Sequence, residues 1–248
     1  MAMCPGVDGL SHNEAEEISE EWAAAGADVL FHAVVEPAEI AGENMTSIVS
    51  TLHQAGHTRS AQAPVCGVVT DFRLSDDARW KRVRQWSRIR DNTVNILPWI
   101  NLNPAGNSVE DSQDIQRFKR GGTGWNMIVM SWRWGFDGCI AYNVFPYEDR
   151  DPENIENWLN PEARQKISVA NSFIAKDIES FDGAIAAWGG NRTAISFVPA
   201  LVKAIQSERR HPLALWCIRE NSDGSPKHPA RVSHDEKPKP WRDLEQAC

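Results

Sequence analysis

Short apolar runs alternate with helical patterns beyond Pro64, and this alternation limits the possible folds more than any other feature. The apolar runs predict strands at residues 66–70, 95–102, 139–144, 184–188 and 213–218. The intervening patterns predict helices at residues 76–90, 112–120, 152–158, 163–180 and 197–207. Strands that alternate with helices form a mainly parallel sheet with helices on both faces. We therefore expect an α/β fold, a three-layer α/β/α domain with about four or five strands in its sheet.

Charge is distributed unevenly along the 248 residues. Residues 1–44 carry ten acidic side chains and no lysine or arginine, whereas the rest of the chain has 26 basic against 24 acidic residues. Residues 45–248, the body of the chain, are thus mildly basic despite the net charge of −8. This charge permits contact with DNA without requiring it. We expect an acidic appendage at 1–44, one domain at 45–233 and a polar, extended tail at 234–248.

Nothing in the sequence points to a membrane or a secreted protein. No apolar stretch approaches the roughly 20 residues of a membrane helix, and the N-terminus lacks the pattern of a signal peptide. The five cysteines are widely spaced, with no Cys-x-x-Cys pair for zinc or redox chemistry. We therefore expect a protein of the reducing cytoplasm.

Two loops stand where predicted strands end. The apolar run at 97–102 breaks into Asn103-Pro104-Ala105-Gly106, and the run at 213–218 is followed by a polar turn and Lys227-His228-Pro229. Proline and glycine stop strand pairing and let the backbone turn sharply. Because parallel strands end at one edge of a sheet, we expect Asn103 and His228 at the rim where open α/β sheets bind ligands.

These loops resemble the two signature loops of the uracil-DNA glycosylase superfamily, nearest to its mismatch-specific and thymine-DNA branches. The chain from about residue 65 to residue 233 is also similar to a bacterial family of unknown function, DUF1643. Three motifs in the same order carry that similarity: Asn-Leu-Asn-Pro at 101–104, Asn-Val-Phe-Pro at 143–146 and Asp-Gly-Ser-Pro-Lys-His-Pro at 223–229. The resemblance implies a uracil-DNA-glycosylase-like fold and a monofunctional DNA N-glycosylase that uses no metal and no cofactor.

The resemblance gives particular side chains a role in that reaction. Asn103 matches the asparagine that positions the attacking water, and His228 matches the histidine that donates a hydrogen bond to the base as charge develops on it. Asn143 matches the asparagine that reads the edge of the flipped base, and Asp111 is a candidate general base. The structural alternatives are a turn cap for the first asparagine, a solvated turn for the histidine, a buried amide for the second asparagine and helix stabilisation for the aspartate.

The first loop also bears on the size of the substrate. Pro104 and Ala105 are expected to line the base pocket, and the loop lacks the bulky Tyr with which the uracil enzymes of the family exclude anything larger than uracil. The pocket is therefore expected to admit a bulky modified pyrimidine. The chain also resembles anti-phage DNA glycosylases, and this resemblance implies glucosylated hydroxymethylcytosine of phage DNA as the candidate substrate. Removal of that base would leave abasic sites that stop phage replication.

The expected partner is DNA, in double-stranded form, and no protein partner is inferred. The candidate DNA contacts are Lys227, Arg231 and Val232 in the histidine loop and Arg82 and Arg84 in the basic run at 79–90. The valine matches the family's apolar wedge, which fills the gap left by a flipped base, and the basic side chains suit phosphate. The tryptophans of the basic run are expected to face the core, and contact with DNA is the alternative for them.

Residues 1–44 resemble a different family. Their motif Gly9-Leu10-Ser11-His12 is similar to the C-terminal end of carbamoylase and hydantoin-type amidohydrolases, whose histidine is one of several metal ligands. The other ligands have no counterpart here, and one ligand cannot hold a two-metal site. We interpret the segment as a remnant of gene fusion or of an early start codon; the alternative is an acidic amphipathic helix that packs on the body.

Two other functions fit the same sequence. One is a hydrolase or transferase of free nucleosides or nucleotides on the same fold, and the other is a noncatalytic module that binds nucleic acid. Activity on free nucleosides distinguishes the first, and DNA binding without abasic sites distinguishes the second.

Overall fold

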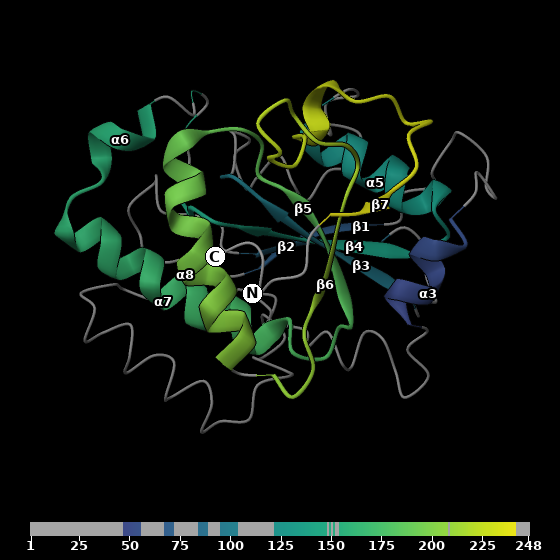
Figure 1. Cartoon of the computed structure of the whole chain (residues 1–248), viewed down its shortest axis with the longest axis horizontal. Coiled ribbons are helices and arrows are strands. Elements are labelled where there is room, and N and C mark those ends of the chain that lie inside the picture. The colour runs from purple at the N-terminus through teal and green to yellow at the C-terminus, as the bar shows by residue number, and fades with distance from the viewer. Residues whose placement is uncertain are drawn as a thin grey trace, which may run out of the picture.

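The computed structural model describes residues 47–55, 67–71, 84–88, 95–103, 122–147, 149, 151, 154–207 and 209–241 (Figure 1). For residues 67–71, 84–88 and 231 it describes the backbone alone. The predicted appendage at 1–44 and the predicted helix at 112–120 lie outside these residues.

A seven-stranded sheet runs through the described part of the chain in the order β1-β2-β4-β3-β5-β6-β7 (Figure 1). Its strands are β1 (Gly67–Asp71), β2 (Arg84–Arg88), β3 (Ile96–Asn101), β4 (Gly138–Asn143), β5 (Gly183–Ala187), β6 (Ala214–Cys217) and β7 (Lys239–Pro240). The central strands β4, β3, β5 and β6 are parallel, and the others join the two edges antiparallel. Asn101 of β3 pairs with Asn143 of β4 and Ala187 of β5, so these strands end at the same rim.

Helices cover both faces of the sheet. From β3 the chain passes through α5 (Thr123–Arg133) to β4, whereas from β5 it passes through α8 (Arg192–Ser207) to β6, on the other side of β3. Right-handed crossovers that run in opposite directions along a sheet lie on opposite faces. Accordingly, α7 (Pro161–Asp177) and α8 lie together on one face, and α5 and α3 (Ile48–His53) lie on the other (Figure 1).

The core lies between these layers. All residues of β3, β4 and β5 are buried, as expected of parallel strands covered on both sides. Trp99 of β3 stacks on Trp134 with 5.5 Å between ring centroids and donates its indole N–H to Ser131 at 2.9 Å. The described tryptophans are mainly part of the core.

The α/β class and the three-layer arrangement are confirmed, but the helix predicted at 76–90 is wrong for residues 84–88. Arg84–Arg88 form β2, which pairs with β1 on one side and with β4 on the other. The spacing of Val83, Trp86 and Ile89 fits one helical face, but the buried strand β4 needs a hydrogen-bonding neighbour on that side. Pairing across the sheet therefore outweighs the local pattern.

The extended tail predicted from residue 234 is also wrong for residues 234–241. Lys239–Pro240 form the edge strand β7 on β6, and the backbone N–H of Trp241 donates to Leu215 at 2.9 Å. The indole of Trp241 lies edge-on against Trp188 at 5.2 Å and donates to the carbonyl of Gly224 at 3.0 Å. Because the ring of Trp241 packs on a buried neighbour and its N–H has a partner, it anchors this segment to the domain. The proline-rich composition had suggested an extended tail.

Within the described residues, no helix combines the length and the apolar character needed to cross a bilayer.

Candidate functional site at the rim between β3 and β5

The rim between β3 and β5 is the point where the direction of the sheet connections changes. The chain leaves β3 toward α5 on one face and leaves β5 toward α8 on the other. In open α/β sheets this divergence opens a crevice beyond the carboxyl ends of the strands, where ligands bind. Asn103 follows β3 and Gly189 follows β5, so these two residues stand where the topology of the sheet predicts such a crevice.

His228 lies against Gly189. A Cβ atom added to this glycine would come within 3.3 Å of the His228 Cβ, and the glycine has a φ of 79°. The preceding turn fixes the loop, since Asn221 Nδ2 donates to Ser225 Oγ at 2.8 Å and the Ser225 hydroxyl donates to Asp223 at 2.6 Å. The loop that follows β6 therefore brings the histidine to the end of β5, at the rim predicted from the sequence.

The surroundings of His228 set its protonation. Burial lowers the pKa of its imidazole from 6.5 to about 4, so the ring is neutral at physiological pH. Its Nδ1 accepts a hydrogen bond from the backbone N–H of Ala230 at 3.3 Å. A neutral imidazole whose Nδ1 is an acceptor carries its proton on Nε2. His228 is thus a neutral hydrogen-bond donor.

A buried amide on α5 holds the histidine loop in place. Asn126 Nδ2 donates to the carbonyl of Pro229, at the start of the short 3-10 helix η3 (Pro229–Arg231), at 2.8 Å. Asn126 Oδ1 lies 2.8 Å from Nε2 of His234, whose pKa is lowered by burial and by Arg133. The neutral His234 donates to the amide oxygen, so both ends of this side chain tie the loop to α5.

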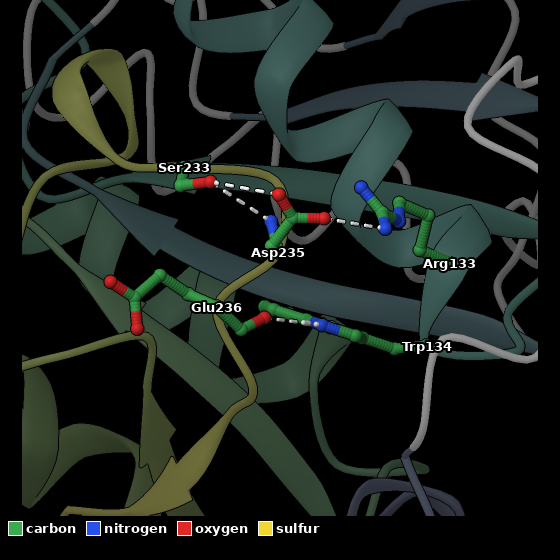
Figure 2. Close-up of polar contacts among 5 residues, drawn as sticks. All are labelled: Arg133, Trp134, Ser233, Asp235 and Glu236. Carbon is green, nitrogen blue, oxygen red and sulfur yellow. Dashed lines mark hydrogen bonds and ion pairs between the residues drawn. The ribbon is translucent and has the colours of Figure 1, made fainter.

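The segment after the loop is bound to the end of the same helix (Figure 2). Arg133 forms an ion pair with Asp235 at 2.7 Å, and the indole of Trp134 donates to the carbonyl of Glu236 at 3.1 Å. Ser233 and Asp235 share two further hydrogen bonds. The chain on the C-terminal side of His228 is therefore fastened to the body at several points.

Asn103 joins the first loop to the segment after β4. Its Nδ2 donates to the carbonyl of Asp149 at 2.8 Å and to that of Tyr147 at 3.4 Å. These bonds fix the orientation of the amide at the crevice.

Asn143 ends β4 with 5% of its surface exposed, and its neighbour Asn101 in β3 is 3% exposed. Asn101 Nδ2 lies 3.2 Å from the sulfur of Met127, and its Oδ1 has no hydrogen-bond partner among the described residues. Two buried amides thus stand side by side beneath the rim.

Of the remaining candidate site residues from the sequence, some lie outside the described residues and two lie within them. Asp111, Pro104, Ala105 and Arg82 lie outside the described residues, as do the side chains of Arg84 and Arg231. Val232 is half-buried and packs on the core, so its wedge role stays a prediction, and Lys227 is half-buried in the histidine loop.

Sequence reasoning missed Asn126 and Gly189. No short motif marks them, because Asn126 acts on a carbonyl 103 positions away and Gly189 acts on a loop that arrives from β6. Among the described residues no group of histidine, cysteine and carboxylate side chains is arranged to hold a metal ion.

Gly189→Ala should lower the stability of the protein and displace the histidine loop at this rim. A side chain at a φ of 79° costs about 1–2 kcal/mol, and the new methyl group would press on His228. Gly135→Ala is the matched control, because its φ is 103° but its nearest neighbour is the Thr51 methyl group at 3.6 Å. Chemical denaturation should show a loss for both variants, with the larger loss for Gly189→Ala because of the added contact with His228. Equal losses in the two variants would contradict the contact.

Asn126→Ala should destabilise the protein by about 2 kcal/mol, since it leaves the Pro229 carbonyl and the His234 N–H without their partner. Asn157→Ala, an exposed amide with a single long hydrogen bond of 3.5 Å, is the control and should change the free energy of unfolding by less than about 0.5 kcal/mol. Urea denaturation measures both. Similar values for the two variants would show that Asn126 does not hold the loop.

Comparison with known proteins gives one family and one short local similarity. The profile of the family described as "Protein of unknown function (DUF1643)" matches residues 79–230. A stretch of 40 residues, 16% of the chain, is 82% identical to N-carbamoyl-L-amino-acid amidohydrolase of Rhizobium meliloti and spans only 10% of that relative. No solved structure matches the chain.

The family match covers more than half of the chain and runs from the start of the basic run through β2 to β6 and the histidine loop. It includes Asn103, Asn143 and His228, the three residues to which the sequence motifs pointed. The resemblance to this family and the short similarity to a carbamoylase are thus confirmed. The chain belongs to the DUF1643 family.

Proposed function

We propose that this protein is a DNA glycosylase of the uracil-DNA glycosylase superfamily that removes a bulky modified pyrimidine and leaves an abasic site. The observation that carries the proposal is a neutral histidine with its proton on Nε2, held at the crevice between β3 and β5. The candidate substrate is glucosylated hydroxymethylcytosine of phage DNA, and the biological role would be defence against phage.

The chemistry requires a donor of this kind. Cleavage of an N-glycosidic bond leaves an electron-poor sugar and an anionic base, so the largest gain comes from hydrogen bonds aimed at the base oxygen where charge develops. A neutral imidazole N–H can donate to that oxygen without giving up its proton. The low pKa of His228 keeps the imidazole in this form throughout the physiological pH range.

Asn103 would hold the attacking water. The amide nitrogen of Asn103 donates to the carbonyl of Asp149, and its amide oxygen has two lone pairs, one of which would accept a hydrogen bond from the water. The sugar carbon is strongly electrophilic in the transition state, so a positioned water needs no strong base. Asn143, at the end of the neighbouring strand, would read the donor and acceptor pattern of the base.

The choice of substrate follows from residue size and from the resemblance. Pro104 and Ala105 offer no bulky ring next to the 5-position of the pyrimidine, where hypermodified cytosines carry their sugar. A site without that ring would admit a large substituent.

A panel of duplexes tests the proposal. The full chain is incubated with unmodified, uracil-containing, hydroxymethylated and glucosylated DNA, and abasic sites are detected by alkaline cleavage. We expect cleavage of the glucosylated duplex above all others. No abasic site in any duplex, together with hydrolysis of free nucleosides, would replace the glycosylase with the nucleoside hydrolase.

A further inference from the structure

We propose that a pocket between α6 (Ile155–Trp158), α7 and α8 binds a phosphate of the DNA backbone beside the nucleotide under attack. The proposal rests on the proposed glycosylase function for the source of the phosphate, and on the charge and position of the pocket for the rest.

The pocket has a volume of about 400 Å³ and opens to solvent. Its lining comes from the N-terminal parts of the helices: Glu156, Leu159, Arg164, Arg192, Thr193, Ser196 and Phe197. Both α7 and α8 lead from the carboxyl end of one parallel strand to the start of another, so both begin at the rim that holds the candidate site. The pocket and the crevice thus share one edge of the sheet.

Positive charge gathers at this pocket in a chain whose net charge is −8. Arg164 and Arg192 both line it, and neither forms an ion pair with another described residue. Glu162, in the first turn of α7, is already paired with Lys166 at 2.9 Å. The N-termini of two long helices add partial positive charge at the same place. Two guanidinium groups and two helix ends form a suitable environment for one phosphate.

The hydroxyl groups in the pocket already donate to other acceptors, so the arginine side chains would supply the hydrogen bonds to a phosphate. The Thr193 hydroxyl donates to Glu156 at 2.8 Å, and the Ser196 hydroxyl donates to the carbonyl of Thr193 at 2.7 Å. Glu156 is the one carboxylate in the lining, and it opposes an anion. Removal of its charge should therefore strengthen binding, which is the opposite of the effect of removing an arginine.

Aromatic rings connect the pocket with the crevice. Arg164 lies over the ring of Phe197 at 5.2 Å, and Phe197 contacts Phe145 at 5.2 Å. Phe145 meets Trp158 at 5.8 Å, and Trp158 stacks on Tyr147 at 4.1 Å. The carbonyl of Tyr147 accepts from Asn103. This continuous packing links the pocket to the residue proposed to hold the attacking water, so a phosphate site and that residue would keep a fixed separation.

The test measures DNA binding by fluorescence anisotropy over a range of salt concentrations, with the full chain and a labelled duplex. Arg164→Gln and Arg192→Gln should each raise Kd roughly tenfold and reduce the slope of log Kd against log salt by about 1. Glu156→Gln keeps an acceptor for Thr193 and should lower Kd a few-fold. Lys203→Gln, on the exposed side of α8 three turns farther along, is the control and should leave Kd within about twofold.

Inorganic phosphate is the second probe, used as a competitor in the same assay. An unchanged salt slope in both arginine variants, or weaker binding by Glu156→Gln, would overturn the proposal. If the arginine variants bind DNA normally but no longer bind inorganic phosphate in a direct titration, the pocket takes free phosphate and the DNA assignment is wrong. Because binding is read without base release, these results stand apart from a failure of the proposed glycosylase activity.

Discussion

His228→Ala should lower the single-turnover rate of base release by roughly 10²- to 10³-fold while DNA binding changes little. The imidazole is a neutral donor whose proton is held on Nε2 by the Ala230 N–H, so it would act on charge that exists only in the transition state. Its loss should therefore appear in the rate at saturating enzyme and not in Kd. The control is His211→Ala, which should keep full activity. His211 is exposed and precedes β6, at the end of the strand opposite the rim.

The pH profile of the wild-type protein provides a second reading of the same residue. The pKa of His228 is lowered from 6.5 to about 4, so the donor is neutral above that value and protonated below it. If the neutral form is required, the rate should be flat from about pH 8 to about pH 5 and fall about tenfold per unit below pH 4. A fall centred near pH 6.5 would show that the histidine is not in the environment described.

Asn103→Ala should lower base release by roughly 10²-fold, with a smaller change in DNA affinity. The change removes the amide that would hold water and the bonds to the carbonyls of Asp149 and Tyr147. Asn103→Asp separates these contributions, because it keeps an oxygen at the crevice but loses the donor to both carbonyls. We expect the aspartate variant to be destabilised, measured by urea denaturation, and Asn157→Ala to behave as wild type. Full activity in Asn103→Ala would remove this residue from the mechanism.

The sequence predicted the central strands because their pattern and their environment agree. β3, β4 and β5 are short apolar runs that end in polar or glycine-containing turns, and all three are buried on both faces. α7 was predicted with errors of a few residues at its ends, since Asn160 and Pro161 begin it with a side-chain cap and a residue suited to the first turn.

The errors in the predicted secondary structure arose where contacts between residues far apart in the sequence determine the structure. β2 looks helical until it is paired with β4, and β7 has two residues that pair only because Trp241 anchors them. α5 was not predicted because residues 126–132 are buried all round, so the helix shows no polar face from which to read its period.

The candidate site likewise contains residues that the sequence identified and residues that it did not. Asn103, Asn143 and His228 lie in short motifs at strand ends, and the order of parallel strands brings them to one rim. Their chemical roles stay predictions. The groups that set the position of His228 could not be read from the chain, because Gly189 and Asn126 are separated from it by 39 and 102 positions in the sequence.

In the proposed mechanism, the neutral His228 at the rim between β3 and β5 promotes release of an intact modified base from DNA. The test is mass spectrometry of the products from a duplex with glucosylated hydroxymethylcytosine. Wild type and His228→Ala are compared under single-turnover conditions. We expect free glucosylated base and an abasic strand with wild type, at a rate at least about 10²-fold above that of the variant. Intact DNA, release of a nucleotide instead of a base, or equal rates for the two proteins would contradict it.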